Sequence, residues 1–427
     1  MFNLKVKDFS CIKTANLEIS PLTLIIGPQA SGKSVICKLI YFCNATSAEI
    51  SRYLVELKYD FEALTKFLSA QFCEWFPASA WGERRFNIEF ITPLYSLKIS
   101  RISTSDKIRV NFSEEYASFY RSQIDILKKL PARKRGSTTA DEEDDFFELE
   151  YRSEQLVAEH VTKWFGRHAI FNQLFIPAGR SFFTSIGKAL IAFEHSGILE
   201  PLTLSFGRRF SSVREFYSRR SSAARNQIFI NLFSDLLGGT PKNDGGKDYL
   251  QAKDGRLIPF AALSSGQQEL IPLAMTLHTL FSVRSGGTMN PFTQRITKRS
   301  VYIEEPEAHL FPKAQSDLVE ILASLISKRR VRDLVITTHS PYVLSKFNNL
   351  IKAGQLSKTS KDHKSLDQII PESAWIPPRA ALAYAIIDGK VQCITDPDGL
   401  IAADYLDNVS SDIIDEFSEL LNFERNI

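Results

Sequence analysis

The amino-acid sequence predicts an α/β fold in which a mixed β-sheet carries helices and receives an inserted helical segment. Three observations lead to this class. Residues 22–26 form a short apolar run that is followed at once by a glycine-containing loop and then by residues with helical character. Residues 2–8 and 15–19 alternate apolar and polar side chains, as half-buried strands do. Two later apolar runs, 301–303 and 334–336, each end in polar residues, which is typical of strands whose carboxyl ends carry a site.

The composition fits an ordinary globular protein of 427 residues. Lys and Arg total 52 and Asp and Glu total 49, so the net charge of +3 gives no strong overall attraction to nucleic acid or to a membrane. The five cysteines show no C-x-x-C spacing, which argues against a disulfide framework and against a zinc site. No run of about 18 apolar residues is present. We therefore expect a cytoplasmic protein without a signal peptide or a membrane span.

The chain is expected to divide into three parts. Residues 1–114 should hold the first strands, the glycine-containing loop, a helix ending near Tyr41, a helical stretch over 48–75 and an antiparallel meander at 86–91, 95–102 and 107–112. Residues 115–248 should form a helical hairpin arm and an arginine-rich helical lobe. Residues 249–427 should complete the sheet and end in a tail of two short strands, 384–387 and 391–394, and an amphipathic helix near 413–421.

The predicted arm has helices over 116–130 and 146–165, separated by a basic block at 131–136 and an acidic block at 141–145. Such blocks cannot bury apolar area, so a solvated hairpin tip is the favoured interpretation and a partner-docking arm is the alternative.

The predicted lobe begins with a strand at 172–176, which ends in the turn Pro177–Arg180, and continues as helices to about Leu237. Arginines accumulate there beside aromatic residues: Arg208, Arg209, Arg214, Arg219, Arg220 and Arg225 with Phe210, Phe216 and Tyr217. This combination can grip a nucleic-acid backbone, and a solvated face or a docking surface for an acidic protein is equally consistent with it. Residues 238–246 are expected to be a turn region before a small hairpin over 249–258.

Residues 27–34 match the pattern G-x-x-x-x-G-K-[ST] at every fixed position. Between a strand and a helix, this pattern predicts a phosphate-binding loop rather than a glycine-rich turn without function. Backbone N–H groups at the helix start converge on the phosphates, Lys33 adds a positive charge, and the Ser34 hydroxyl can ligate Mg²⁺. We expect ATP and Mg²⁺ as cofactors, with nucleotide contacts from Gly27, Gln29, Ala30, Ser31, Gly32, Lys33 and Ser34.

Residues 263–269 resemble the L-S-G-G-Q signature of ABC-type ATPases, with Ser265 in place of the first glycine. The resemblance implies that these residues bind the γ-phosphate of a nucleotide held by a second subunit, through N–H groups at a helix start. The same residues can also cap the helix. The candidate contacts are Ser264, Ser265, Gly266 and Gln267.

Residues 301–312 resemble a Walker B strand, and residues 334–341 resemble the strand that carries the switch histidine. The resemblance implies that Glu304 supports Mg²⁺, with glutamate in place of the usual aspartate, and that Glu305 polarises the attacking water. It also implies that His339 contacts the γ-phosphate. Gln173 is a candidate for the Mg²⁺-sensing glutamine and Arg180 for a nucleotide contact, although no motif fixes either of them.

The four motifs occur in the order of an ABC-type ATPase, and the long helical separation between Ser34 and Leu263 resembles the SMC, RecF and OLD group. The segments 176–180, 303–312 and 337–341 look like OLD-family ATPases. OLD nucleases carry a TOPRIM domain, but only residues 340–427 follow His339, and Asp396-Pro397-Asp398 is best interpreted as an acidic turn.

An ATPase of this kind without TOPRIM resembles the ATPase subunits of two-gene phage-defence systems, PARIS first and Septu second. That resemblance implies a homo-oligomer, at least a dimer, with ATP sites between subunits. It also implies an ATP-hydrolysing sensor that holds and releases a separately encoded nuclease or toxin after a phage signal. The alternatives are a DNA repair or recombination ATPase of the RecF and SMC type, which binds DNA directly, and a scaffold that binds ATP without turnover.

Overall fold

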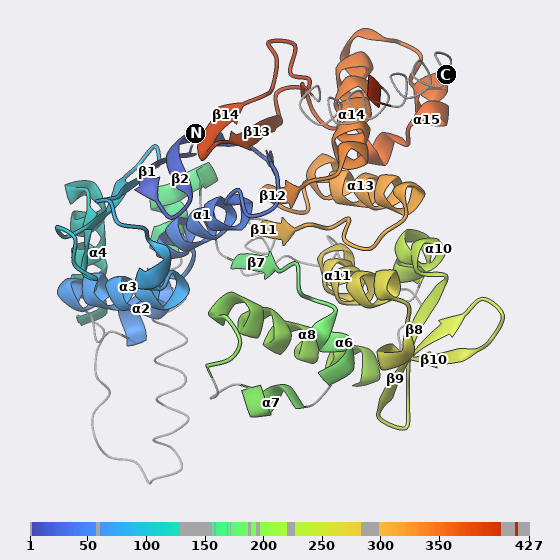
Figure 1. The fold of residues 1–427 in the computed structure, drawn as a ribbon, viewed down its shortest axis with the longest axis horizontal. Helices are drawn as coiled ribbons and strands as arrows, with labels where there is room; N and C mark the ends of the chain where they lie inside the picture. Colours follow the sequence, from blue (N-terminus) through green and yellow to red (C-terminus); the bar gives the residue numbers. More distant parts are fainter. Residues whose placement is uncertain are drawn as a thin grey trace, which may run out of the picture.

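The computed structural model describes residues 2–56, 60–128, 156–157, 159–168, 170, 172–186, 189–193, 197–219, 227–282, 299–402 and 415–416. In this part of the chain an 11-stranded mixed sheet runs through the molecule, and helices cover both of its faces (Figure 1). The strand order is β6-β5-β4-β1-β2-β14-β13-β3-β12-β11-β7. The predicted α/β class is confirmed.

One half of the sheet is antiparallel. It contains β1 (Phe2–Phe9), β2 (Ile12–Ile19) and the meander β4 (Asn87–Ile91), β5 (Ser96–Arg101) and β6 (Ile108–Phe112). β1 pairs with β2 on one side and β4 on the other. The alternation along β1 buries Phe2, Leu4 and Val6 on one face, as the period of two predicts.

The other half is parallel. β13 (Ala381–Ile387), β3 (Leu22–Ile26), β12 (Asp333–Thr338), β11 (Arg299–Glu304) and β7 (Asn172–Ile176) run in one direction. The register places Ile26 beside Thr338, Glu304 beside Thr337, and Ile303 beside Ile176. The carboxyl ends of these strands therefore meet at one edge. β14 (Lys390–Cys393) turns back antiparallel to β13 and joins β2, which links the two halves.

Helices of the two faces belong to two hydrophobic clusters. Ile25 of β3 lies in the cluster that includes α1 (Lys33–Ala48), α3 (Phe61–Trp75) and α4 (Glu114–Lys128). Leu24 lies in the opposite cluster, with α11 (Ser265–Ser282), α13 (Pro312–Ser327) and α14 (Pro341–Thr359). α8 (Pro201–Arg219) places its apolar side chains mainly in this second cluster. The shorter helices are α2 (Ile50–Glu56), α6 (Phe182–Ile186), α7 (Leu190–Phe193), a π-helix at Ile230–Ser234, α10 (Asp235–Leu237) and α15 (His363–Ile369).

Two boundaries differ from the prediction. α1 continues to Ala48 instead of ending near Tyr41, because residues 42–47 are all buried and can extend its packed side. The helical stretch over 48–75 is interrupted, and α3 begins at an N-cap where the Asp60 carboxylate accepts from the N–H groups of Glu62 and Ala63.

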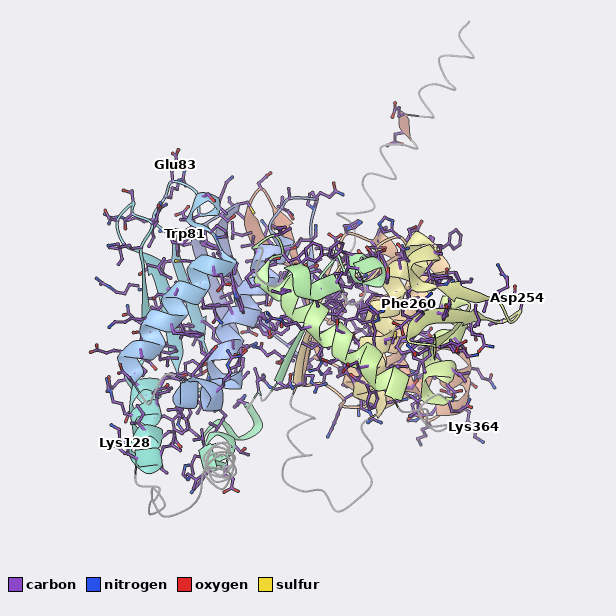
Figure 2. All side chains as sticks on the ribbon, turned by 90° about the horizontal axis from the view of Figure 1, so that it is seen from below. Trp81, Glu83, Lys128, Asp254, Phe260 and Lys364 are labelled. Carbon is purple, nitrogen blue, oxygen red and sulfur yellow. The ribbon has the colours of Figure 1, made fainter. Side chains whose placement is uncertain are left out.

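The predicted turn region 238–246 is wrong in part. Residues 239–244 form β8 (Gly239–Asp244), which pairs with β9 (Lys247–Ala252), and β10 (Leu257–Pro259) completes a small sheet. The chain reverses only at Gly245 and Gly246, with φ of 57° and 78°. Figure 2 shows Asp254, in the β9–β10 turn, at the opposite end of the molecule from Trp81.

Several predictions fall on residues outside the described ranges. These are the charged tip at 131–145, most of the second arm helix, Arg220, Arg225 and nearly all of the helix near 413–421. Within the described ranges, no helix combines the length and the apolar character that crossing a bilayer requires. Asp396 forms the expected acidic turn, since its carboxylate and its N–H both bond to the backbone of Leu400.

Candidate functional site

The site lies at the edge where the parallel strands end. The loop after β3 carries residues 27–34, the turn after β11 carries Glu305, and the segment after β12 carries His339. The turn after β7 lies beside them, because the Ala178 N–H donates to a carboxylate oxygen of Glu304. The order of the parallel strands thus brings the loop at 27–34, Glu305 and His339 to one edge of the sheet, although they are far apart in the sequence.

Two glycines make the loop after β3 possible. A Cβ on Gly27 would lie 2.7 Å from Ser31 Oγ and 3.1 Å from Ile386 O. Gly32 has a φ of +104°, and a Cβ there would lie 2.6 Å from a methyl carbon of Ile12. Gly32 is the N-cap of α1 and supplies no side-chain cap, so the first N–H groups of α1 face the loop. A helix start of this kind can bind an anion.

Lys33 lies inside the loop. It is only 5% exposed, and its Nζ donates to Gly27 O at 2.9 Å and Pro28 O at 2.8 Å. Burial lowers the pKa of Lys33, while the charges of Glu305, Glu307 and Glu304 raise it. The buried hydroxyl of Ser31 has no hydrogen-bond partner among the described residues. A buried ammonium and an unsatisfied hydroxyl in one loop fit a phosphate group.

Glu304 fits a metal ligand. It is 5% exposed, and its Oε2 accepts from Ala178 N at 3.3 Å, while its Oε1 has no hydrogen-bond partner in the described part of the chain. Burial raises the pKa of Glu304, and Lys38 and the Ser34 hydroxyl oppose this. Ser34 and Glu304 therefore provide the hydroxyl and the carboxylate oxygen that Mg²⁺ prefers, and they are the residues that would hold it.

We expect Glu304→Gln to stabilise the nucleotide-free protein at neutral pH by about 1–3 kcal/mol, since it removes an unsatisfied buried charge. The folded-state pKa lies above the ordinary value of 4.5, so the folded state binds more protons and the Glu304 carboxylate destabilises it increasingly as pH rises. The gain should be full above the folded pKa and should vanish below about pH 4. Denaturant unfolding of the wild-type and Glu304→Gln proteins in EDTA, from pH 4 to 8, measures the difference in their free energies of unfolding. A difference that is equal at every pH would contradict the prediction.

Glu305 adopts a left-handed backbone conformation, with a φ of +42°. Its N–H donates to Thr337 O at 2.9 Å, which ties the turn to β12. Its carboxylate is 29% exposed, and Oε1 lies 3.7 Å from Nδ1 of His339, whose side chain is 44% exposed. A left-handed glutamate is strained, and such strain persists where surrounding contacts fix the turn. Glu305 and His339 thus form an accessible acid and imidazole pair at the sheet edge.

Glu307 lies in the Walker B segment 301–312, and the sequence alone predicts no role for it. It is buried, and its Oε1 accepts from Thr338 Oγ1 at 2.6 Å and from the His339 N–H at 3.0 Å. The same oxygen lies 3.6 Å from His339 Nδ1. Glu307 therefore fixes the segment that carries His339. The sequence signal that could have indicated this role is the position of Glu307, an acid that follows Glu305 by two residues.

The signature residues form the start of α11. Ser264 and Ser265 are exposed, whereas Gly266 packs so closely that a Cβ there would lie 2.8 Å from His309 O. Gln267 Oε1 accepts from the N–H and the hydroxyl of Ser264, so Gln267 completes the helix start in place of the expected Gln268 or Glu269. Within the described ranges no hydrogen bond or ion pair joins these residues to the loop at 27–34.

The position of Gln173 corrects its assignment. Gln173 pairs with Ser300, four positions before Glu304 on the neighbouring strand, and its amide bonds to Tyr302 OH and Tyr41 O. Gln173 therefore lies near the start of β7, the last strand of the sheet, away from the strand ends that carry the site, and it links β7 to β11 and α1. Its contacts give it a structural role in place of the metal contact.

Arg180 is likewise not placed to contact a nucleotide. Its side chain is fully buried, and its guanidinium binds backbone carbonyl groups. The sequence around β7 does not indicate this burial, because all but one of the carbonyl groups that Arg180 binds lie about 90 to 125 residues further along the chain.

The chain is similar to several known proteins. A protein-family model described as "AAA domain, putative AbiEii toxin, Type IV TA system" matches residues 22–345. The SMC head domain from Thermotoga maritima is similar in structure, with 11% identity and a TM-score of 0.34 over 92% of this chain and 97% of that chain. The recombination mediator protein RecF of the RecFOR pathway shows 13% identity and a TM-score of 0.31 over 92% and 97%.

MJ1267, an ATP-binding cassette of an ABC transporter in its ADP conformation, shows 12% identity and a TM-score of 0.34 over 96% of each chain. No curated protein sequence matches the chain.

Proposed function

Because the chain belongs to the family described as AAA domain, putative AbiEii toxin, Type IV TA system, and is a P-loop ATPase, we propose that its ATP cycle controls a separately encoded effector. The observation that carries the ATPase part is the convergence of Lys33, Glu304, Glu305 and His339 at one sheet edge.

The geometry supports hydrolysis by positioning and proton transfer. The N–H groups at the start of α1 and the Lys33 ammonium would bind the phosphates of ATP. Mg²⁺ held by Ser34 and Glu304 would neutralise charge on those phosphates. The Glu305 carboxylate would accept a proton from the attacking water, and His339 would contact the γ-phosphate from the next strand. Glu307 keeps the His339 segment in place.

The exposed signature serines support a composite site. Ser264 and Ser265 lie at the N-terminus of an 18-residue helix, and their side chains are open to solvent. We propose that they bind the γ-phosphate of a nucleotide held by a second copy of the chain, so that the working form is a homodimer or a larger homo-oligomer. ATP binding would then close the subunit interface and hydrolysis would open it.

The effector part of the proposal depends on two observations. The family description names a toxin and a type IV toxin–antitoxin system. The sequence also resembles the ATPase subunits of the PARIS and Septu phage-defence systems. Both support a cytoplasmic ATPase that holds a nuclease or toxin and releases it after a phage protein or DNA signal.

A native pull-down of the Glu305→Gln protein from its own host, with ATP and Mg²⁺, tests this proposal. Slow hydrolysis should keep the ATP-bound assembly intact, so we expect one stoichiometric nuclease or toxin subunit by mass spectrometry. Lys33→Ala is the matched control, because it should not hold ATP and should recover less of that subunit. Nuclease activity of the isolated chain, or recovery of no partner protein, would contradict the effector role.

A specific pocket favours a second candidate, a DNA-binding ATPase. A cavity of about 240 Å³ beside α8 and β7 is lined by residues that include Arg208, Arg209, Ser205, Ser212 and Tyr41. The predicted arginine face is nevertheless not continuous. Arg214 forms an ion pair with Asp248 and lies over the buried ring of Phe210.

DNA recovered in the same pull-down without a partner protein would favour this second candidate. Salt-dependent binding of duplex DNA that stimulates ATP hydrolysis would support it further.

A further inference from the structure

Arg180 is the largest charged side chain among those that are fully buried in the described part of the chain. Arg180 follows β7 after the short turn Pro177–Gly179, and its guanidinium contacts the backbone of Glu304 and Glu305. A buried arginine is unfavourable unless its charge and its N–H groups are satisfied. Its partners therefore indicate what the residue does.

All five N–H groups of the Arg180 guanidinium donate to backbone carbonyl groups. Nε donates to Glu269 O at 3.0 Å, and Nη1 donates to Pro177 O at 3.1 Å and Glu304 O at 2.9 Å. Nη2 donates to Glu305 O at 3.1 Å and Pro306 O at 3.3 Å. The planar fork of the guanidinium is thus fully used, and no other side chain offers five donors in this geometry.

Four of these five carbonyl groups belong to two functional segments, and the fifth, Pro177 O, lies in the turn that carries Arg180 itself. Three successive ones, from residues 304–306, form the turn that holds Glu305 at its left-handed φ of +42°. The fourth belongs to Glu269 in the first turns of α11, the signature helix, and the buried Glu269 carboxylate also forms an ion pair with Arg180 at 3.4 Å. One guanidinium therefore joins the Walker B turn to the signature helix.

Burial lowers the pKa of Arg180, and the charges of Glu269, Glu307, Glu304 and Glu305 raise it. The surrounding acids thus favour the charged form, in which all five donors are present. A second contact joins the same two segments, since Gly266 packs against the His309 carbonyl.

We infer that Arg180 is a positioning residue for ATP hydrolysis, which fixes the turn that aims the Glu305 carboxylate and couples that turn to the signature helix. The inference rests on the proposed ATPase function. Arg180 touches neither nucleotide nor water in this role, and it acts through Glu305. Its loss should therefore affect turnover and leave nucleotide affinity, which depends on the loop at 27–34, nearly unchanged.

Arg180→Lys tests the inference, because lysine keeps the charge but offers three donors in a different geometry. We expect kcat for ATP hydrolysis to fall about 100-fold, since a small displacement of a catalytic group has an effect of that size. The Kd for ATP, measured with a fluorescent ATP analogue, should change less than about threefold. The double variant Arg180→Lys, Glu305→Gln should be no slower than Glu305→Gln alone, because Arg180 acts through Glu305.

Arg101→Lys is the matched control. Arg101 also has a nearly buried side chain that donates to backbone carbonyl groups, those of Gly82, Arg84, Thr104 and Ser105. It lies beside Trp81, at one end of the molecule (Figure 2). Arg101→Lys should lower the melting temperature, because hydrogen bonds to backbone carbonyl groups are lost. It should leave kcat unchanged, because Arg101 lies outside the site.

The outcomes separate the inference from the proposed function. If the wild-type protein shows no ATP turnover that Glu305→Gln removes, the proposed function fails whatever Arg180 does. If that turnover is present and Arg180→Lys keeps the wild-type kcat, or adds a further loss to Glu305→Gln, the inference is wrong. If Arg180→Lys does not fold, Glu269→Gln replaces it, because this variant keeps the Glu269 carbonyl and removes only the ion pair with Arg180. Glu269→Gln should lower kcat less than is expected for Arg180→Lys, and it should retain ATP affinity. A wild-type kcat for Glu269→Gln would overturn the inference.

Discussion

Glu305→Gln is expected to lower kcat for ATP hydrolysis about 1,000-fold, since a positioned general base contributes on the order of 10²–10⁴-fold. The amide keeps the size and the backbone bonds of Glu305 but cannot accept the proton of the attacking water. The carboxylate is partly exposed and lies beside His339, so the substitution should leave the fold intact. ATP affinity should stay within about threefold, because Lys33 and the start of α1 remain unchanged. Phosphate release and binding of a fluorescent ATP analogue measure the two quantities.

Glu114→Gln is a suitable control for this experiment, because Glu114 is an exposed acid at the start of α4 that forms an ion pair only at the surface. Its turnover should equal that of the wild-type protein. Turnover of Glu305→Gln above a tenth of the wild-type rate would remove Glu305 from the role of general base. Equal turnover of wild-type and Glu305→Gln proteins would favour a scaffold that binds ATP without hydrolysing it.

Two inactive variants should restore activity to each other when they are mixed. Lys33→Ala removes phosphate binding in one subunit, and Ser265→Arg blocks the signature of the other. If each site combines the loop of one subunit with the signature of its partner, a mixed dimer contains one intact site. After random exchange of equal amounts, about a quarter of the wild-type sites should be intact in a twofold dimer. Phosphate release before and after mixing measures the recovery.

Ser265 is preferred to Gly266 for this test because Ser265 is exposed, whereas any side chain at Gly266 would collide with the His309 carbonyl and disturb the fold. The control mixture combines Lys33→Ala with a chain that carries both substitutions. No dimer in that mixture has an intact loop, so it should stay inactive. Recovery in neither mixture would contradict a site shared between subunits.

The sequence predicted the segments in which local chemistry decides the conformation. The loop at 27–34 is defined by the steric needs of Gly27 and Gly32, and both appear as fixed letters of one motif. The strands before Glu304 and His339 are buried on both faces, so their apolar runs could be recognised without knowledge of their neighbours. The catalytic assignments themselves stay predictions that the experiments above test.

The contacts that support the site could not be predicted in this way. Glu307 and Arg180 obtain their roles from groups that are distant in the chain, namely the His339 segment and the backbone of residues 304–306. Arg180 also shows why residue type alone misleads. An arginine after a strand suggests an exposed charge, but here five buried carbonyl groups determine its position.

The prediction of a turn region at 238–246 missed β8 for a related reason. Gly239, Pro241, Asn243 and Asp244 are poor strand formers, and they indicate a turn when considered alone. Pairing with β9 and the two left-handed glycines at 245 and 246 determine the strand instead. Tertiary context therefore overrode local preference at the edge of a small sheet.

The position of β13 has a consequence for how the protein is made. β3, the strand that leads into the loop at 27–34, lies between β12 and β13, and Gly27 packs against Ile386. A ribosome synthesises β3 long before β13, so the strands on both sides of β3 are complete only after residues 381–387 have been made. Pairings of such long sequence separation form slowly. We therefore expect the nascent chain to bind nucleotide only after residues 381–393 have left the ribosome, and a chain that stops before β13 to lack ATP binding.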